Sequence, residues 1–328
     1  MAVPRPKVSV LIPVYNAEKY LARALDSALT QSIDDLEVLC VNDASTDSSV
    51  EILKGYADKD PRVKVIDKPC NEGSMMARKS AYEAALGEYF FFLDADDYLL
   101  PDALRDLYNA GVAADADVVV SDYLIERSNG LRTYSSKTAT LTDDTPDSFR
   151  MFIASGKSNT LWSILYRRDL FDGKNYETFM HQTFSEDRML LIQLISNVRK
   201  TALLRKPSMV YFLNDSSVTH KRMSDERVAS MVKALRWSVD YLEPAPEYHE
   251  AALVHYLRTL SFLIESGYPA DVICQAIPEN RSLLSFASLK RMLGLRLAVH
   301  TRLSISSSLY RKSAARARLL IRRIIKKY

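Results

Sequence analysis

The chain has 328 residues, of which 47% are hydrophobic and 26% are charged, and its formal net charge is +3. This composition is typical of a globular protein and excludes a disordered chain. The length allows one elaborated α/β domain, or a large domain together with a smaller one.

The first 120 residues alternate short apolar runs with amphipathic segments, a pattern that predicts a mainly parallel sheet with helices on both faces. The apolar runs are rich in Val, Ile and Phe, as expected of strands that are buried on both faces. The expected strands are 8–14, 37–41, 63–66, 89–93 and 117–120. The expected helices are 17–30, with Asn16 as its N-cap, 47–58 and 74–86, and Pro101 marks the start of another.

Beyond residue 120 the periodicity weakens, and between 121 and 183 only 160–166 is expected to be ordered. A helix is then predicted over 187–196 and a strand over 208–213. From Asp225 onward the sequence predicts helices, interrupted by prolines near 244–246 and 278. We therefore expect an α/β domain over 1–220 and a helical region over 221–328.

Three acidic residues directly follow the apolar run at 89–93, in the sequence Asp94-Ala95-Asp96-Asp97. Carboxylates crowded at the end of a strand repel one another unless a cation lies among them. Hard oxygen ligands suit Mg²⁺ or Mn²⁺, and in open α/β sheets ligands bind at the carboxyl ends of strands. Taken alone, such a motif is more often a solvated turn or the N-cap of the helix at Pro101, so it needs support from other segments.

Three other strand ends supply that support. They are Pro13-Val14-Tyr15-Asn16, Val41-Asn42-Asp43, and Asn71-Glu72-Gly73-Ser74 with Arg78 one helical turn later. In this order and spacing, together with the acidic motif, the segments resemble the inverting family 2 glycosyltransferases of the GT-A fold. The resemblance is clear over residues 7–125, weaker to about 220 and absent beyond.

The resemblance implies a donor site for a nucleotide-sugar at the ends of the first four strands. It places Pro13, Val14 and Tyr15 around the base, Asp43 as an acceptor from the base, Glu18 near the ribose, and Asn71, Gly73 and Arg78 beside the nucleotide. The residue types alone leave other interpretations open. Asn16 and Asp47 suit helix caps, Glu18 suits compensation of a helix dipole, Tyr15 suits packing and Asp43 suits a turn.

The resemblance also implies a divalent metal, Mn²⁺ or Mg²⁺, that Asp96 binds directly. Asp94 would bind the ribose or a water of the metal, and the role of Asp97 is left open. His220 would supply a further metal contact or touch the diphosphate, although packed histidines are commoner than ligands. Lys221 and Arg222 beside it would steady phosphate or be solvated.

A second acidic pair, Glu186-Asp187, opens the helix expected at 187–196. Its position alone favours compensation of the helix dipole. In the resembled family, the Asp of such a pair is the general base, and this match implies Asp187 as the base and Glu186 as its helper. Trp162 lies in a segment that resembles the Trp-Asn-Lys-Leu-Tyr stretch of bacterial members, with Ser163 and Ile164 in place of Asn and Lys. It is expected either to pack in the core or to form a platform for a sugar ring.

Together these residues imply an inverting transfer of a hexosyl or N-acetylhexosaminyl group, with UDP as the expected carrier, to a hydroxyl of a lipid-linked or polymeric glycan. Two alternatives remain. A nucleotidyltransferase would carry a Gly-rich basic signature after the first strand, where this chain has Pro13-Val14-Tyr15-Asn16. A non-catalytic relative that only binds polymer or membrane would have no need of Asp96 and Asp187.

The C-terminal segment 281–328 carries 13 Lys or Arg and no acid, and the rest of the chain carries 31 basic against 41 acidic residues. Within 313–328 an apolar face at 317, 320, 321, 324, 325 and 328 is flanked by basic residues, which predicts a helix on an anionic membrane surface. The alternative is a helix that packs on the protein body. Nucleic-acid binding is not expected, because no aromatic residues interleave the basic ones.

Three widely spaced cysteines, Cys40, Cys70 and Cys274, form neither a disulfide framework nor a metal motif, which favours a reducing compartment. No signal peptide and no transmembrane run are evident in the sequence. We therefore expect a cytoplasmic protein that is peripheral on the inner face of the cell membrane.

Overall fold

The computed structural model of the chain describes residues 5–213 and 224–265. The chain divides into two compact units. The first comprises Met1–Arg150 and Thr160–Arg222, and the second comprises Met151–Asn159 and Met223–Tyr328. That residues 1–220 form the catalytic domain and residues 221–328 a separate helical region is a proposal.

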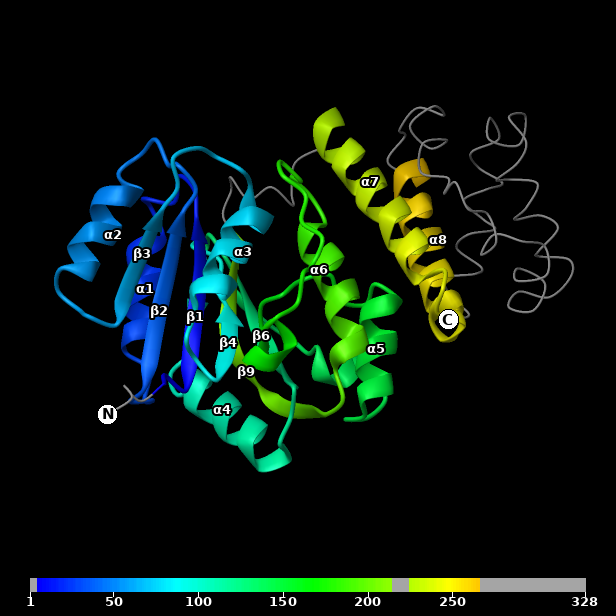
Figure 1. Cartoon of the computed structure of the whole chain (residues 1–328), viewed down its shortest axis with the longest axis horizontal. Coiled ribbons are helices and arrows are strands. Elements are labelled where there is room, and N and C mark those ends of the chain that lie inside the picture. Colours follow the sequence, from blue (N-terminus) through cyan, green and yellow to red (C-terminus); the bar gives the residue numbers. More distant parts are fainter. Residues whose placement is uncertain (1–4, 214–223, 266–328) are drawn as a thin grey trace, which may run out of the picture. The chain divides into compact units, whose positions relative to one another are not determined.

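A mixed sheet forms the centre of the first unit, with the strand order β3-β2-β1-β4-β8-β6-β9-β5 and with β7 paired to β6 (Figure 1). The strands are β1 Val8–Val14, β2 Leu36–Asn42, β3 Val63–Asp67, β4 Tyr89–Phe92, β5 Tyr98–Leu99, β6 Val118–Arg127, β7 Arg132–Ser135, β8 Ile164–Arg167 and β9 Thr201–Leu213. The helices of this part of the chain are α1 Leu21–Leu29, α2 Ser49–Ala57, α3 Ser74–Ala84, α4 Ala103–Ala114, α5 Pro146–Ala154 and α6 Glu186–Leu194.

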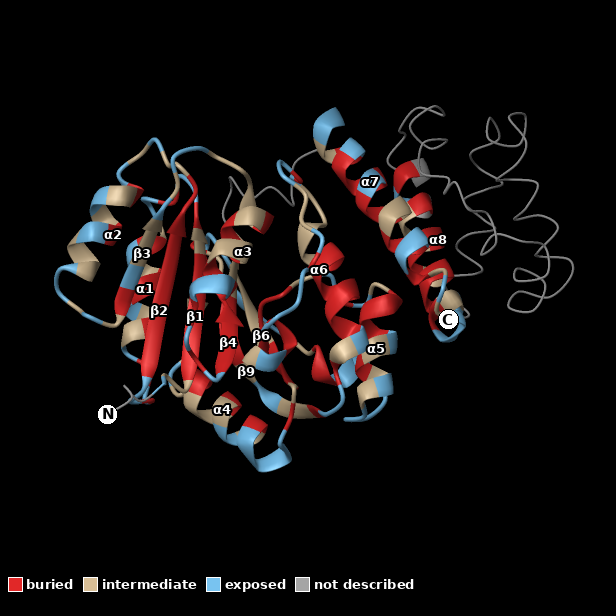
Figure 2. Ribbon diagram, in the orientation of Figure 1, coloured by how far each residue is buried: buried red, intermediate tan, exposed pale blue. Residues whose placement is uncertain are grey.

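The first four strands are parallel to one another, as the alternation of strands and helices predicts. Every residue of β2 and β4 is buried (Figure 2), which explains why β4 is a continuous apolar run and β2 is apolar apart from Glu37 and Asn42. Beyond β4 the sheet departs from the expected parallel arrangement. β8 is antiparallel to both β4 and β6, and β7 and β5 add further antiparallel pairings.

The segment after residue 120 contains more regular structure than its sequence indicates. β6 runs to Arg127 and pairs in parallel with β9, although the expected strands cover only 117–120 and 208–213. Most of the extra length of β6 is only half-buried, so it lacks the apolar run that would have revealed it. The α5 helix also lies where no helix is expected.

Helix α1 begins at Leu21, four residues later than expected, and the interpretation of Asn16 as its N-cap is wrong. Asn16 has a φ of 50°, outside the helical region, and its side-chain oxygen accepts the Thr46 N–H at 2.8 Å. It therefore joins the loop after β1 to the loop after β2. The start of α2 agrees better with expectation, because Asp47 Oδ1 accepts the Ser49 N–H at 3.0 Å.

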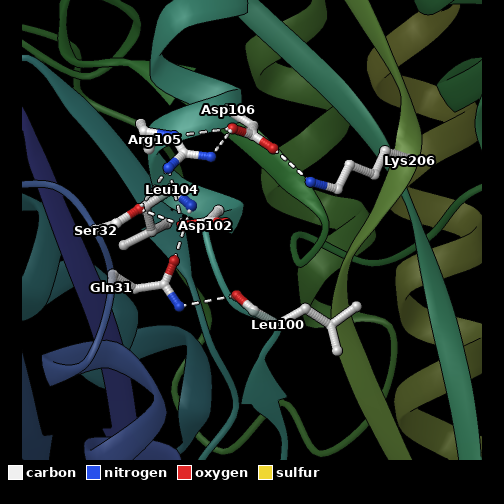
Figure 3. Close-up of polar contacts among 8 residues, drawn as sticks. All are labelled: Gln31, Ser32, Leu100, Asp102, Leu104, Arg105, Asp106 and Lys206. Carbon is white, nitrogen blue, oxygen red and sulfur yellow. Dashed lines mark hydrogen bonds and ion pairs between the residues drawn. The ribbon is translucent and has the colours of Figure 1, made fainter.

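Helix α4 begins two residues after Pro101, and its first turn is fixed by a side chain from outside the helix. Asp102, at the N-cap, has a φ of 64° and makes no side-chain capping bond. Instead Gln31 Oε1 accepts the Leu104 N–H at 3.0 Å, and Gln31 Nε2 donates to the Leu100 carbonyl (Figure 3). Figure 3 also shows Arg105 bound to Ser32 and Asp102, and Lys206 paired with Asp106. This network secures the chain that follows the acidic motif.

The described part of the second unit contains α7 Asp225–Leu242 and α8 His249–Glu265, which pack against each other. Helices beyond residue 225 with a break near 244–246 are as the sequence predicts. Ser224 caps α7 by accepting the Arg227 N–H. Among the described residues no helix is both long and apolar enough to cross a bilayer. The expected basic helix at 313–328 and the expected break at 278 lie outside the described residues.

Candidate functional site

The carboxyl ends of β1 and β2 lie side by side and are joined by reciprocal hydrogen bonds between the loops that follow them. The Asp43 N–H donates to the Val14 carbonyl at 2.8 Å. The Glu18 N–H donates to Asp47 Oδ2, and Glu18 Oε2 accepts the Ser48 N–H, each at 3.0 Å. The two loops therefore form one rigid edge, in which Glu18 is exposed and holds the neighbouring loop.

Asp43 is a buried carboxylate, 3% exposed, that organises the loop between β3 and α3. Its Oδ1 accepts the Glu72 N–H at 3.0 Å, and its Oδ2 accepts the Gly73 N–H at 2.8 Å. Lys68 lies 3.5 Å from Asp43 Oδ1 and also pairs with Glu72. Asp43 is thus more than a turn former, because both of its oxygens fix the loop that begins α3.

Gly73 occupies a backbone conformation that favours glycine, with a φ of 95°. A Cβ atom at this position would meet the backbone nitrogen of His181 at 3.4 Å. The His181 N–H in turn donates to the Glu72 carbonyl at 3.0 Å. The loop is therefore held between Asp43 on one side and residue 181 on the other, and half-buried Asn71 precedes it.

Arg78 on α3 connects three acidic residues that come from distant parts of the chain. Its Nη2 lies 2.8 Å from Asp94 Oδ1, and its Nη1 lies 2.9 Å from Asp187 Oδ1 and 3.4 Å from Glu186 Oε1. Burial disfavours the Arg78 cation, but the three carboxylates outweigh this effect and raise its pKa above the ordinary value. The residues expected at the donor phosphates and the residue expected to act as the general base therefore lie in one cluster.

Asp187 is the acid of this cluster whose pKa the surroundings shift most strongly. Burial raises the pKa of Asp187 to about 7, Glu186 and Asp94 add to the increase, and Arg78 and the Leu161 N–H oppose it. The Leu161 N–H donates to Asp187 Oδ2 at 3.1 Å. Glu186 Oε1 accepts the Ser74 hydroxyl at 2.7 Å, which ties the start of α6 to the start of α3. A carboxylate with a pKa near neutrality is suited to proton transfer at physiological pH.

The acidic motif after β4 divides into two half-buried carboxylates and a fully buried one. Asp94 and Asp96 are half-buried, whereas Asp97 is 0% exposed and its Oδ1 accepts the Phe212 N–H at 2.9 Å. Burial raises the pKa of Asp97 well above the ordinary value, and the charges of Asp96 and Asp94 add to the increase. Asp97, whose role the sequence left open, thus anchors the motif to the end of β9.

The residues at the motif fit a metal only as part of a larger ligand set. Within residues 5–213 and 224–265, no three His, Cys, Asp or Glu side chains are grouped to hold a metal ion. The mutual repulsion of the three carboxylates favours a cation beside them. Carboxylate oxygens together with diphosphate oxygens and water form a normal Mg²⁺ or Mn²⁺ shell, so the fit requires the donor.

The other residues expected at the site differ in how far their side chains are buried. Val14 is buried and Pro13 is half-buried, whereas the Tyr15 side chain is 52% exposed and does not pack in the core. Trp162 is 7% exposed and stacks on Tyr211 at 5.3 Å, so it packs in the core. His220, Lys221 and Arg222 lie outside the described residues.

Two basic residues at the site escape prediction from sequence. Arg23 on α1 donates to the Asp96 carbonyl at 2.8 Å, and its guanidinium lies over the rings of Phe212 and Tyr98. Lys137, between β7 and the following turn, is buried beside Trp162. Neither belongs to a local motif. Arg23 reaches the acidic turn because α1 packs against β5, and the turn that follows Lys137 packs against β6 and β9.

The chain is similar to proteins of one family over most of the first unit. The model of "Glycosyl transferase family 2" matches residues 9–207. The uncharacterized glycosyltransferase YibD of Escherichia coli is 29% identical over 77% of this chain and 78% of its own length. EpsJ of Bacillus subtilis, also an uncharacterized glycosyltransferase, is 29% identical over 70% of this chain and 68% of its own.

Solved structures share the fold. Staphylococcus aureus TarS 1–349, crystallised in complex with UDP-GlcNAc, is 20% identical and has a TM-score of 0.69 over 98% of this chain and 91% of that one. The mannosyltransferase PcManGT of Pyrobaculum calidifontis, in complex with GDP-Man and Mn²⁺, has a TM-score of 0.53 at 16% identity, over 99% and 87% of the two chains. With the family model covering more than half of its residues, this chain belongs to glycosyl transferase family 2 and has the GT-A fold.

Proposed function

We propose that the chain transfers a sugar from a UDP-sugar to a hydroxyl of a cell-surface glycan, with inversion at the anomeric carbon and with Asp187 as the general base. The observation that carries the proposal is the Arg78 cluster, in which one buried cation contacts Asp94, Glu186 and Asp187. This contact links the end of β4 to the start of α6, so donor phosphate and base chemistry can take place within one site.

The donor side of the proposal rests on the fixed loops at the ends of β1, β2 and β3. The nucleobase of the donor would lie against Pro13, Val14 and the exposed Tyr15 ring, and Asp43 would accept a hydrogen bond from it. Both Asp43 oxygens already accept backbone N–H groups and Oδ1 also lies beside Lys68, so the second lone pair of Oδ2 is the one for the nucleobase. Glu18 would face the ribose, and Asn71 and Gly73 would lie beside the nucleotide.

The proposed metal ligand is Asp96, with Asp94 nearby and His220 as a further candidate. A bound Mn²⁺ or Mg²⁺ would neutralise the charge that develops on the departing nucleoside diphosphate. The chain's own contribution is to hold the motif in place. Arg23 fixes the Asp96 carbonyl and Asp97 fixes the backbone of β9, so the Asp96 side chain is presented from a rigid turn.

The proposed base step follows from the environment of Asp187. A sugar hydroxyl is a poor nucleophile at neutral pH, and a base on the face opposite the leaving group removes its proton as it attacks. The raised pKa makes Asp187 a stronger acceptor than an ordinary carboxylate. Glu186, held by Ser74, would orient the acceptor or the base. A single attack from the opposite face inverts the anomeric centre, and no covalent intermediate is needed.

The acceptor class is proposed from relatives whose printed names describe surface polymers. A poly(ribitol-phosphate) beta-glucosyltransferase of Bacillus spizizenii is 41% identical over 35% of this chain and 18% of its own length. A chondroitin synthase of Pasteurella multocida is 46% identical over 30% of this chain. A lipid-linked or polymeric acceptor at an anionic membrane surface would also suit the basic residues of 281–328.

The proposal is tested by the release of UDP from UDP-sugars with Mn²⁺ or Mg²⁺. We expect metal-dependent turnover by the wild type, loss of metal dependence and of activity in Asp96→Ala, and loss of turnover with retained UDP binding in Asp187→Asn. Asp60→Asn, in the turn before β3, is the control and is expected to behave as wild type, because within the described residues the Asp60 carboxylate bonds to Arg62 of the same turn and to nothing at the site. An active Asp187→Asn enzyme would contradict the role of the base, and a wild type that neither binds nor turns over any UDP-sugar would contradict the donor.

A further inference from the structure

Lys137 is a buried lysine with no part in the proposed reaction. It lies between β7 and the turn Thr138–Thr140, and it is 7% exposed. Its Nζ donates to Thr160 Oγ1 at 2.9 Å and to the Trp162 carbonyl at 2.6 Å. Nζ also lies 4.1 Å from the centroid of the Trp162 ring. Burial of an ammonium group is costly unless it is hydrogen-bonded, and these two acceptors offset part of that cost.

The two hydrogen-bond acceptors of Lys137 flank the residue that binds the proposed base. Leu161 lies between Thr160 and Trp162, and its N–H donates to Asp187 Oδ2 at 3.1 Å. The other oxygen, Oδ1, faces Arg78 Nη1 at 2.9 Å. Lys137 therefore holds, from both sides, the peptide that fixes one of the two carboxylate oxygens.

Lys137 is itself held in place by a second buried acid. Asp122 on β6, 1% exposed, accepts the Thr138 N–H at 2.9 Å and the Ser136 hydroxyl at 3.0 Å, so it binds the residues on both sides of Lys137. It also accepts the Tyr134 hydroxyl. The contacts form a continuous chain from the sheet to the base, which no flexible surface lysine would show.

Charge gives Lys137 a second effect on Asp187. The charged and titratable groups around the general base are Arg78 from α3, Glu186 from its own helix, Asp94 after β4, Lys137 from the segment after β7, and the neutral phenol of Tyr166 on β8. Two of them are cations and two are carboxylates. Burial lowers the pKa of Lys137 to about 7, and the charge of Asp187 opposes this decrease. The two groups therefore stabilise each other's charged forms.

We infer that Lys137 is a positioning residue for Asp187: it fixes the 160–162 segment that orients the carboxylate, and its charge favours the ionised base. The inference rests on the proposed role of Asp187. It concerns the chemical step alone, because none of the contacts that Lys137 makes within the described part of the chain reaches the loops at the ends of β1, β2 and β3 where the nucleotide is proposed to bind.

The test is Lys137→Met, which keeps the length of the side chain and removes its charge and its donors. With UDP-sugar hydrolysis as the assay, we expect kcat to fall about tenfold or more, while the KM for the donor and the Kd for UDP with Mn²⁺ stay within about twofold. The acid limb of the kcat profile should move to higher pH, because the carboxylate loses a nearby cation. Lys7→Met, which breaks an exposed pair with Asp35 at the amino end of β1, is the matched control and should keep the wild-type kcat and profile.

The outcomes distinguish this inference from the proposed function. Absence of turnover in the wild type would overturn both, whereas an active wild type and a Lys137→Met enzyme with the same kcat and acid limb would overturn the inference alone. A variant with lower Tm but an unmoved acid limb would show a merely structural role and would also overturn it. If Lys137→Met does not fold, Thr160→Val removes one acceptor with little change of shape. It should lower kcat less but in the same direction, and wild-type kinetics there would refute the inference.

Discussion

Replacing Asp187 with Asn is expected to stabilise the protein at alkaline pH while it abolishes transfer. Asp187 is half-buried, with its side chain 12% exposed, and desolvation raises its pKa from 3.8 to about 7. In the unfolded chain the group ionises near its ordinary pKa, so between the two values the folded state holds a proton that the unfolded state releases. Stability from this group is therefore full at low pH and is lost as the pH rises towards 7.

The magnitude follows from the difference between the two pKa values. An increase of about three in pKa corresponds to about 4 kcal/mol of folding free energy that is absent above pH 7. Asn resembles the protonated acid and does not ionise, so it avoids this loss. Its NH₂ group lies less favourably beside Arg78 than a carboxylate oxygen does, which makes about 4 kcal/mol an upper bound. Even half of this value should raise the Tm by several degrees.

The assay is thermal unfolding of the wild type and of Asp187→Asn at pH 5 and pH 8.5. We expect the difference in Tm to favour the variant clearly at pH 8.5 and to be less than half as large at pH 5, where only the part of the loss between the ordinary pKa and pH 5 has accumulated. Asp115→Asn is the control, because Asp115 is exposed and its pairs with Lys200 and Arg167 lower its pKa to about 2, below the whole range tested. Its Tm difference from the wild type should be the same at both pH values. A variant that is less stable at pH 8.5, or a difference that does not change with pH, would refute the reasoning.

Three further predictions concern the donor loops and the base. Gly73→Ala should weaken the binding of UDP with Mn²⁺, measured by calorimetry, because an L-residue is strained at a φ of 95° and the loop must relax to relieve that strain. Unchanged affinity would show that the nucleotide does not contact the loop. Asp43→Asn should raise the donor KM about tenfold, because it leaves the Glu72 or Gly73 N–H without its acceptor at a cost of about 1–3 kcal/mol. A wild-type KM would count against the proposed nucleobase pocket. The kcat of the wild type should rise with pH through about 7, because Asp187 acts in its ionised form; a rate that is flat from pH 5 to 8 would exclude it as the base.

The first half of the fold is predictable because its elements are local. The expected strand at 8–14 coincides with β1, and the helices α2 and α3 lie within their expected ranges, since apolar periodicity sets them and buries them directly. The second half depends on pairing between distant segments. β6 and β9 pair along half-buried stretches, and the antiparallel strand β8 separates β4 from β6. No periodicity within one segment specifies such a register.

The candidate site shows the same division. The acids at the strand ends and Arg78 are visible as motifs, and the structure brings Arg78 into contact with Asp94 and Asp187. Asp43 also proves to hold a loop, which its place in the sequence did not reveal. Arg23 and Lys137 carry no local signal, because each acts through a backbone carbonyl that only tertiary structure brings near. Motif spacing thus identifies groups at strand ends and misses the groups that support them.

The most direct test of the account is the anomeric configuration of the first sugar released when the enzyme hydrolyses an α-linked UDP-sugar such as UDP-GlcNAc. Proton NMR follows the product before mutarotation, with water as the acceptor in place of the glycan hydroxyl. A single displacement assisted by Asp187 predicts the β-anomer as the first product, and Asp187→Asn should release little of it. Initial release of the α-anomer would contradict the inverting mechanism, and with it the proposed role of Asp187 as the base.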